Sequence, residues 1–372
     1  MIKILEMFGE PISYGGQESV AYNMLSSFYP NEKFNIDLFT PYYADNEKLI
    51  EFIENNKGKV FHLGQEFKVG DNRFKLTKCV DDFFDKHDKY DVVHIHTGSL
   101  ATMLVYAKAA KKHGVKKVIA HAHIANRVIS LGFLLRKIII CHFLKKYVDI
   151  FIGCSNKVIE TKYTKDIQDK ANLIYNGIDI QKFSFDREHR DEIRSKYNIG
   201  DKFLIGSLGR LNPQKNNYFM LEIARKLKEK SFDFKLMLVG NGEIENDLKE
   251  YVKKHDIDDV VIFAGEQKDA YKYYSAFDIF FITSYFEGLP VTAIEAQVSG
   301  LPTIISKCVT MEAKVSNRTY YLPIDNIDIW VDKILEIKDN YKLYEDRTNI
   351  DVDYSKCDRN ITYKNVERMY TC

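Results

Sequence analysis

The sequence predicts an α/β fold in which two Rossmann-like halves each contain a parallel sheet. Short β-branched or apolar runs alternate with longer amphipathic stretches along the whole chain, a pattern typical of strand–helix repeats. The length of 372 residues suits two domains of roughly 100 to 200 residues each. With 45% hydrophobic and 29% charged residues, the composition excludes collagen, coiled coils and extended disorder.

The expected strands are short because each apolar run is bounded by polar or turn-forming residues. In the first half they are 2–8, 36–40, 60–63, 92–96, 118–121, 150–154 and 173–175. In the second half they are 203–207, 236–239, 260–263, 279–283 and 303–306. Amphipathic runs predict helices between them, for example at 216–230, 243–255 and 291–299.

A charged, helix-forming segment at 186–197 separates the two series of strands. We therefore expect an N-terminal domain at 1–185, a C-terminal domain at 186–355 and a last helix within 356–372. Tyr363, Val366 and Tyr370 lie at helical spacing in this tail. Spacing does not decide which domain the helix packs on, and a return to the N-terminal domain is one of the arrangements we expect.

The most informative segment follows the expected strand 279–283, because Rossmann-like sheets bind ligands at the carboxyl ends of their strands. The chain turns at Gly288 and begins a helix near Pro290, a residue that suits the first helical turn. The backbone N–H groups of 288–291 would then point into the strand-end crevice, which favours binding of an anion.

Glu287 and Glu295 flank this turn. Eight residues of helix advance by about 800°, or about 80° past two full turns, so the carboxylates can approach one ligand from different sides. Each alone is better explained by structure, Glu287 as a helix-start acid and Glu295 as a solvated helix residue. Their occurrence in one strand-turn-helix favours a ligand site.

Several motifs, spread along nearly the whole chain, together resemble those of one known enzyme family. Glu287-Gly288-Leu289-Pro290, Glu295-Ala296 and Gly300-Leu301-Pro302 together resemble the E-x7-E signature of GT-B retaining glycosyltransferases, family 4, of the capsular and exopolysaccharide type. The other motifs in family order are Gly15-Gly16, Asn176-Gly177-Ile178-Asp179 with Phe183, Gly209-Arg210 with Lys215, and Val239-Gly240-Asn241-Gly242-Glu243. The resemblance implies a GT-B fold, whose acceptor-binding and nucleotide-sugar-binding domains face each other across a cleft.

The resemblance also implies catalytic roles. Arg210 and Lys215 are expected to hold the donor diphosphate, because a guanidinium fork and a mobile ammonium suit two linked phosphates. Glu287 is expected to accept hydrogen bonds from the transferred sugar and Glu295 from the ribose hydroxyls. Gly288, Leu289 and Pro290 complete the expected nucleotide site. Without the family pattern, Arg210 and Lys215 are equally well explained as surface cations.

Three further candidates follow other strand ends. Gly15 and Gly16 are expected to form a cradle beside the donor diphosphate, with a plain tight turn as the alternative. His123 is expected to contact the sugar, with a partly buried core histidine as the alternative, whereas His121 is expected to be a core histidine. Asn241 is expected on a second ligand loop, although a capped turn explains it at least as well.

The sequence offers little support for a metal or a cofactor. His94 and His96 repeat the i, i+2 spacing of His121 and His123, but no carboxylate or thiolate falls at ligand spacing beside them. We therefore expect no metal, and the nucleotide sugar is a substrate. The six cysteines form no C-x-x-C pair, which favours reduced thiols.

A basic stretch at 127–147 is the candidate membrane contact. Its apolar blocks are interrupted by Arg136, Lys137, Lys145 and Lys146, a composition typical of an interfacial helix on anionic lipid. The alternative is a domain helix with one buried face and Lys or Arg on the other. No apolar run reaches the ~18 residues of a membrane span and no signal peptide is evident, so we expect a cytoplasmic protein, with peripheral contact at the inner membrane face.

The expected function is transfer of a hexosyl group, with retention, from a nucleotide diphosphate sugar, chiefly a UDP-sugar, to a glycan or lipid-linked acceptor in polysaccharide or glycolipid biosynthesis. The alternatives are a GT-B nucleotide-sugar epimerase, a phosphorylase-like enzyme, and an inactive glycosyltransferase-like partner subunit. The last rests on the unusual segment 307–313, where relatives carry a Gly-rich acidic loop. We expect no nucleic-acid partner, because the basic stretch contains no recognised nucleic-acid-binding motif.

Overall fold

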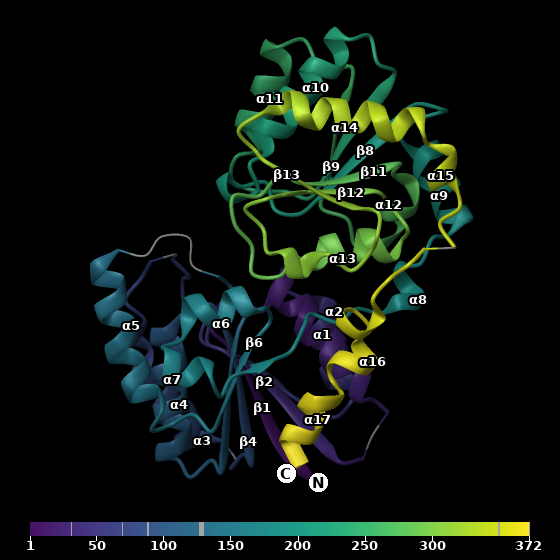
Figure 1. Cartoon of the computed structure of the whole chain (residues 1–372). Helices are drawn as coiled ribbons and strands as arrows, with labels where there is room; N and C mark the ends of the chain where they lie inside the picture. The colour runs from purple at the N-terminus through teal and green to yellow at the C-terminus, as the bar shows by residue number, and fades with distance from the viewer. Residues whose placement is uncertain (31, 69, 88, 126–129, 349, 372) are drawn as a thin grey trace. The chain divides into compact units, whose positions relative to one another are not determined.

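The computed structural model describes all residues except 31, 69, 88, 126–129, 349 and 372 (Figure 1). The chain forms two compact units, Met1–Gly177 with Arg359–Cys372, and Ile178–Asp358. The division after Gly177 precedes the expected boundary at 185. The short helix α8 (Ile180–Phe183) packs on α12 and α13 of the second unit, which accounts for the earlier division.

The first unit contains a seven-stranded parallel sheet with the order β3-β2-β1-β4-β5-β6-β7. All seven strands were predicted, and the order reverses between β1 and β4. Every residue of β4 is buried, as expected for a parallel strand covered on both faces. The strands are β1 (Ile2–Phe8), β2 (Phe34–Thr40), β3 (Val60–His62), β4 (Val92–Thr97), β5 (Lys117–Ala122), β6 (Ile150–Gly153) and β7 (Asn172–Leu173).

Helices cover both faces of this sheet (Figure 1). The neighbours α3, α4 and α5 pack side by side, and α1 packs against α16. Serine hydroxyls cap α4, α5 and α6, consistent with the preference of serine for helix starts. The helices are α1 (Gly16–Phe28), α2 (Glu47–Asn55), η1 (Arg73–Leu76), α3 (Thr77–Lys86), α4 (Leu100–Lys112), α5 (Leu131–Leu144), α6 (Asn156–Lys162), α7 (Lys165–Gln168), α16 (Arg359–Thr362) and α17 (Lys364–Thr371).

The second unit contains a six-stranded parallel sheet with the order β10-β9-β8-β11-β12-β13. Five of its strands were predicted. The edge strand β13 was missed because its Thr-Tyr-Tyr-Leu sequence is mostly half-buried and carries no strong apolar run. The strands are β8 (Phe203–Leu208), β9 (Phe234–Val239), β10 (Val261–Gly265), β11 (Ile279–Ile282), β12 (Thr303–Ser306) and β13 (Thr319–Leu322).

The helices of the second unit begin and end close to the predicted positions. Residues 216–230, 243–255 and 291–299 correspond to α10, α11 and α13. The elements are α8 as given, α9 (Arg187–Lys196), η2 (Pro213–Lys215), α10 (Asn217–Glu229), α11 (Glu245–Lys254), α12 (Tyr271–Ala276), α13 (Val291–Val298), η3 (Met311–Ala313), α14 (Ile327–Asp339), α15 (Lys342–Glu345) and η4 (Tyr354–Lys356).

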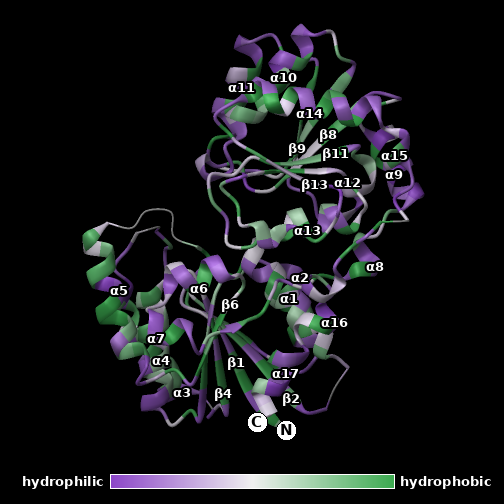
Figure 2. Cartoon of the chain, viewed as in Figure 1, coloured by the Kyte–Doolittle hydropathy of each residue, from purple (hydrophilic) through white to green (hydrophobic). Residues whose placement is uncertain are grey.

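Each unit has its own core. Hydrophobic residues gather along the strands of both sheets (Figure 2). In the second unit the single tryptophan, Trp330, is fully buried, and its ring meets Phe219 and Phe281 edge-on. Its indole N–H donates to the Pro323 carbonyl at 2.7 Å, so its polar atom is satisfied.

The C-terminal tail packs on the first unit, which decides the question that helical spacing left open. Tyr363, Val366 and Tyr370 are all buried there. The Gly177 N–H donates to the Tyr363 hydroxyl at 2.9 Å, and the Tyr370 hydroxyl donates to the Glu6 carboxylate at 2.7 Å. The tail thus contributes two buried tyrosines to the first unit.

Candidate active site

The loops after β8 and β11 lie at the reversal of strand order in the second unit, where open parallel sheets bind ligands. Hydrogen bonds join the two loops. The Tyr285 N–H donates to the Gln214 carbonyl, and the Gln214 amide donates to the Phe286 carbonyl, each at 2.9 Å. The Thr283 hydroxyl donates to the Lys215 carbonyl at 2.8 Å. These hydrogen bonds hold the two loops together at one edge of the second sheet.

Lys215 and Glu287 form an ion pair across these loops, with 2.7 Å between Nζ and Oε1. The Ser284 hydroxyl donates to the same oxygen at 2.8 Å. The Asn212 side chain accepts from the Lys215 N–H at 3.1 Å and fixes the turn that carries the lysine. The two side chains are only 22% and 12% exposed, so solvent screens this attraction less than at an open surface.

Arg210 follows β8 and is exposed. It lines the same small pocket as Lys215, so the two predicted diphosphate ligands share one site. A larger surface hollow, lined by Lys202, Lys228 and Lys235, lies at the opposite edge of the sheet, where the strands begin. Its lysines are therefore remote from the strand-end loops. The other residues lining the small pocket are Ser207, Leu208, Gly209, Leu211, Asn217 and Leu238.

Close backbone contact brings the loop after β9 against the loop after β8. Gly240 has φ +130°, and a Cβ built there would lie 2.2 Å from the Gly209 carbonyl oxygen, so a side chain does not fit. The Leu211 N–H donates to the Asn241 carbonyl at 2.8 Å. The Asn241 side chain itself donates to Glu266 at 2.7 Å. Asn241 therefore lies beside the predicted phosphate loop.

Glu295 lies on α13 and is 9% exposed. The Tyr274 hydroxyl donates to its Oε2 at 2.5 Å. Burial, together with this carboxylate, raises the pKa of Tyr274 well above its usual value. Interpreting Glu295 as a solvated helix residue is therefore wrong. Gly288, Leu289 and Pro290 are buried in the preceding turn, and α13 begins at Val291, with Pro290 as its cap residue.

In the first unit, the paired glycines lie at the start of α1. Gly15 is the cap residue and Gly16 is the first, exposed residue of the helix. A Cβ built at Gly16 meets no atom within 4 Å, whereas one at Gly15 would lie 2.6 Å from the flexible Glu18 carboxylate. The backbone at Gly16 is therefore open to approach.

His123 follows β5 and is 7% exposed. Its Nε2 lies 2.9 Å from His96 Nδ1. Burial, with the nearby histidines, holds the pKa of His123 well below its usual value, so the ring is neutral at pH 7. His121 is fully buried, which confirms it as a core histidine.

Sequence reasoning missed a second pair of polar residues at the strand ends of the first unit. Lys162 is 4% exposed, its ammonium donates to the Gly98 carbonyl at 2.5 Å, and burial lowers its pKa to about 8. The Thr97 hydroxyl donates to Glu10 at 3.2 Å, and burial raises the pKa of Glu10. Glu10 could have been predicted as a candidate site residue because it comes just after a predicted strand. Nothing in the sequence around Lys162 indicates that its side chain reaches the strand ends.

Two family descriptions match most of the chain. Residues 14–182 match "Glycosyltransferase Family 4" and residues 189–350 match "Glycosyl transferases group 1". The putative glycosyltransferase EpsF of Bacillus subtilis is 26% identical, over 86% of this chain and 84% of its own length. The UDP-Gal:alpha-D-GlcNAc-diphosphoundecaprenol alpha-1,3-galactosyltransferase of Escherichia coli is also 26% identical, over 84% and 82%.

A likeness to solved structures extends over the whole chain. The crystal structure of Anabaena Alr3699/HepE in complex with UDP and glucose has a TM-score of 0.80 and covers 100% of both chains at 16% identity. At this identity the likeness supports the fold, two Rossmann-like domains of the GT-B class.

Proposed function

This chain belongs to the GT-B glycosyltransferases of the group 1 and family 4 type, and we propose that it transfers a hexosyl group from a UDP-sugar to an acceptor hydroxyl with retention. The observation that carries the proposal is the Lys215–Glu287 pair, with Arg210 in the same pocket, at the reversal of strand order. UDP in the complex of the structural neighbour Alr3699/HepE supports the choice of nucleotide.

In this proposal the second unit binds the donor. Arg210 and Lys215 stabilise the negative charge that develops on the diphosphate as the glycosidic bond breaks, so that step requires no divalent metal. Glu287 holds Lys215 in place and accepts hydrogen bonds from the sugar hydroxyls. Glu295, fixed by Tyr274, accepts from the ribose.

Retention follows if the acceptor attacks from the face that the diphosphate leaves. The C–O bond to the diphosphate breaks, the bond to the acceptor oxygen forms on the same face, and a diphosphate oxygen takes the acceptor proton. No carboxylate needs to act as a nucleophile. His123, a neutral ring at the carboxyl end of β5, suits a hydrogen bond to a sugar hydroxyl because it adds no charge to the site.

The first unit is proposed to bind a glycan or lipid-linked acceptor at the cytoplasmic face of the membrane. The name of the E. coli relative, which acts on a diphosphoundecaprenol-linked sugar, supports an acceptor of this class. Glu10 and Lys162, buried at the strand ends, offer polar groups that a sugar hydroxyl or a diphosphate can contact.

Helix α5 supports contact with the membrane surface. Hydrophobic residues predominate along α5 (Figure 2). Several of them are exposed, with exposed fractions of 75% for Leu131, 56% for Leu135 and 58% for Ile139. The alternative, a domain helix with one buried face and Lys or Arg on the other, fits the buried Ile140, Cys141 and Leu144 but not this largely apolar exposed face. Arg136 and Lys146 are also exposed, and cations beside an apolar stripe suit anionic lipid.

The part of 127–147 at residues 127–129 lies outside the described residues. Within the described part of the chain, every helix is too short or too polar to cross a membrane. The proposed contact is therefore a peripheral one, made by α5 lying on the lipid surface.

Product analysis with isotopically labelled UDP-sugars and a lipid-diphosphate-linked acceptor tests the proposed reaction. We expect free UDP in equal amount to an extended acceptor, and NMR of the product should show the anomeric configuration of the donor. An isomerised nucleotide sugar would instead indicate an epimerase. No UDP release without a second protein would indicate a partner subunit.

A further inference from the structure

The first unit buries a cluster of histidines in its sheet. In the strand register Glu6 of β1 lies beside His94 of β4, and His96 of β4 lies beside His121 of β5. All four side chains are fully buried. A group of ionisable side chains in a sheet interior is costly unless they are paired or bind an ion, so the cluster requires an explanation.

Hydrogen bonds determine which ring nitrogens carry protons. Both oxygens of the Glu6 side chain face a possible donor, Oε2 facing His96 Nε2 and Oε1 facing the Tyr370 hydroxyl. Its Oε2 therefore accepts from His96 Nε2–H at 2.6 Å, and its Oε1 accepts from the Tyr370 hydroxyl at 2.7 Å. Since Tyr370 donates to Glu6, its oxygen accepts from His94 Nδ1–H at 2.6 Å.

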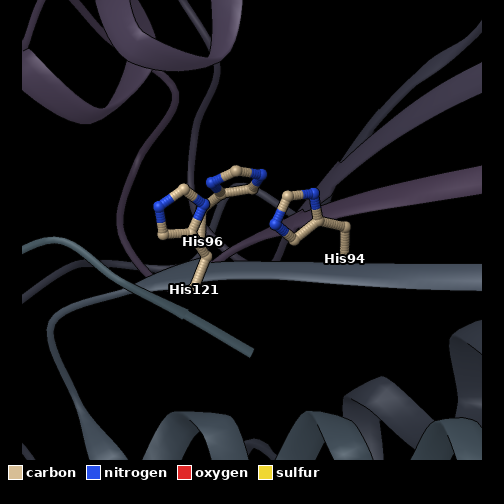
Figure 3. Close-up of side chains that lie close together, drawn as sticks. All are labelled: His94, His96 and His121. Carbon is tan, nitrogen blue, oxygen red and sulfur yellow. The ribbon is translucent and has the colours of Figure 1, made fainter. Parts of the chain in front are cut away.

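The other nitrogens of these two rings, His94 Nε2 and His96 Nδ1, consequently carry a lone pair and no proton. His94 Nε2 has no hydrogen-bond partner among the described residues, and neither nitrogen of His121 has one. One nitrogen from each of His94, His96 and His121 lies within 4.8 Å of the others. Figure 3 shows the three rings gathered together, with one nitrogen of His94 turned toward the other two rings.

We propose that His94, His96 and His121 bind one divalent transition-metal ion of the zinc class, with Glu6 and Tyr370 as the outer hydrogen-bonding shell. Neutral imidazoles are preferred ligands of Zn²⁺. Metal-bound histidines commonly donate their other N–H to a carboxylate or an oxygen that fixes the tautomer, as Glu6 and Tyr370 do here. The ion also supplies the positive charge that a buried Glu6 carboxylate requires.

The distances allow ligation after small side-chain movements. At the centre of a triangle with 4.8 Å sides, an ion lies about 2.8 Å from each corner, against the usual Zn–N distance of about 2.0–2.1 Å. Shifts of less than about 1 Å close this gap. His96 Nδ1 would then exchange its 2.9 Å contact with His123 Nε2 for the ion.

This site departs from the expectation of no metal, which rested on the lack of a carboxylate or thiolate at ligand spacing. Glu6 lies far from the histidines in sequence, and only the pairing of β1 with β4 brings it to them. The site is structural, since the three histidines are fully buried within the sheet of the first unit. Its test is therefore independent of glycosyl transfer.

Elemental analysis of the full chain, expressed with zinc in the medium and purified without chelator, tests the proposal. We expect about one zinc ion per chain, and visible absorption typical of Co²⁺ with nitrogen ligands after cobalt substitution. His121→Ala should lose the ion. His142→Ala, which removes an exposed histidine of α5, should keep it.

Spectroscopy of the unaltered chain decides the question if His121→Ala fails to fold. X-ray absorption at the zinc edge should show a shell of nitrogen ligands with several imidazoles. A sulfur ligand would overturn the proposal. So would a folded chain that contains only trace metal and whose melting temperature and spectra do not change when Zn²⁺ or Co²⁺ is added.

Discussion

The Lys215 ammonium lies 2.7 Å from the Glu287 carboxylate, although 72 residues separate them in the sequence. One follows β8 and the other follows β11, neighbours that meet where the strand order of the second sheet reverses. The lysine is therefore held at the place where a diphosphate is proposed to bind, and its counter-ion lies where the sugar is proposed to bind.

Removing either cation of this pocket should slow turnover. We expect Arg210→Ala and Lys215→Ala each to reduce kcat by roughly ten- to a thousandfold, because each removes a charge that stabilises the leaving diphosphate. Steady-state kinetics with a saturating UDP-sugar measures this. Lys202→Ala, at the opposite edge of the sheet, is the matched control and should keep normal turnover. Near-normal kcat in both site variants would show that neither Arg210 nor Lys215 stabilises the leaving diphosphate.

The hydrogen bond from Tyr274 to Glu295 should matter for donor binding. Tyr274→Phe is expected to raise KM for the UDP-sugar with a smaller change in kcat, because Glu295 loses the bond that orients it. Unfolding in urea should show a loss of about 1–3 kcal/mol, the usual cost of leaving a buried group without its partner. Tyr320→Phe removes a partly buried bond between the hydroxyls of Tyr320 and Tyr344 and should leave KM unchanged. A similar KM in both variants would contradict the role of Glu295.

Buried Lys162 should make stability depend on pH in the alkaline range. Its pKa of about 8 in the folded chain lies below the ordinary 10.5, so the unfolded chain binds more protons between these values. The unfolding free energy should then rise with pH from about 8 to 10.5, by up to about 3 kcal/mol at 1.36 kcal/mol per unit. Urea unfolding of the native chain and of Lys162→Met across this range measures it. Equal slopes of unfolding free energy against pH for the two proteins would contradict the lowered pKa of Lys162.

The apolar stripe of α5 should bind anionic lipid. Leu135→Glu with Ile139→Glu is expected to reduce sedimentation with vesicles of mixed anionic and zwitterionic phospholipid at least tenfold, because charged side chains resist burial among acyl chains. Binding of the unaltered chain should weaken with added salt and with purely zwitterionic vesicles. Leu343→Glu, at an exposed apolar residue of the second unit, should have no effect. Unchanged binding of the α5 variant would refute the contact.

Local sequence patterns determined most of the fold. Apolar runs predicted twelve of the thirteen strands that the described residues form, and β13, Thr-Tyr-Tyr-Leu, was missed because it contains no such run. The strand-turn-helix with Glu287 and Glu295 could be recognised as a ligand site because it follows a buried strand of a parallel sheet. The roles of Arg210 and Lys215 came instead from the family resemblance, since a surface loop explains these cations equally well.

Tertiary structure alone decided which of these residues meet. Strand order is a long-range property, so the pairing of β8 with β11, which joins Lys215 to Glu287, has no signal in either segment. The same holds for Glu6 and Tyr370, from opposite ends of the chain, which complete the histidine cluster only because the tail packs on the first sheet. Burial likewise excluded the alternative of Glu295 as a solvated helix residue, since exposure depends on what packs against a helix rather than on its own sequence.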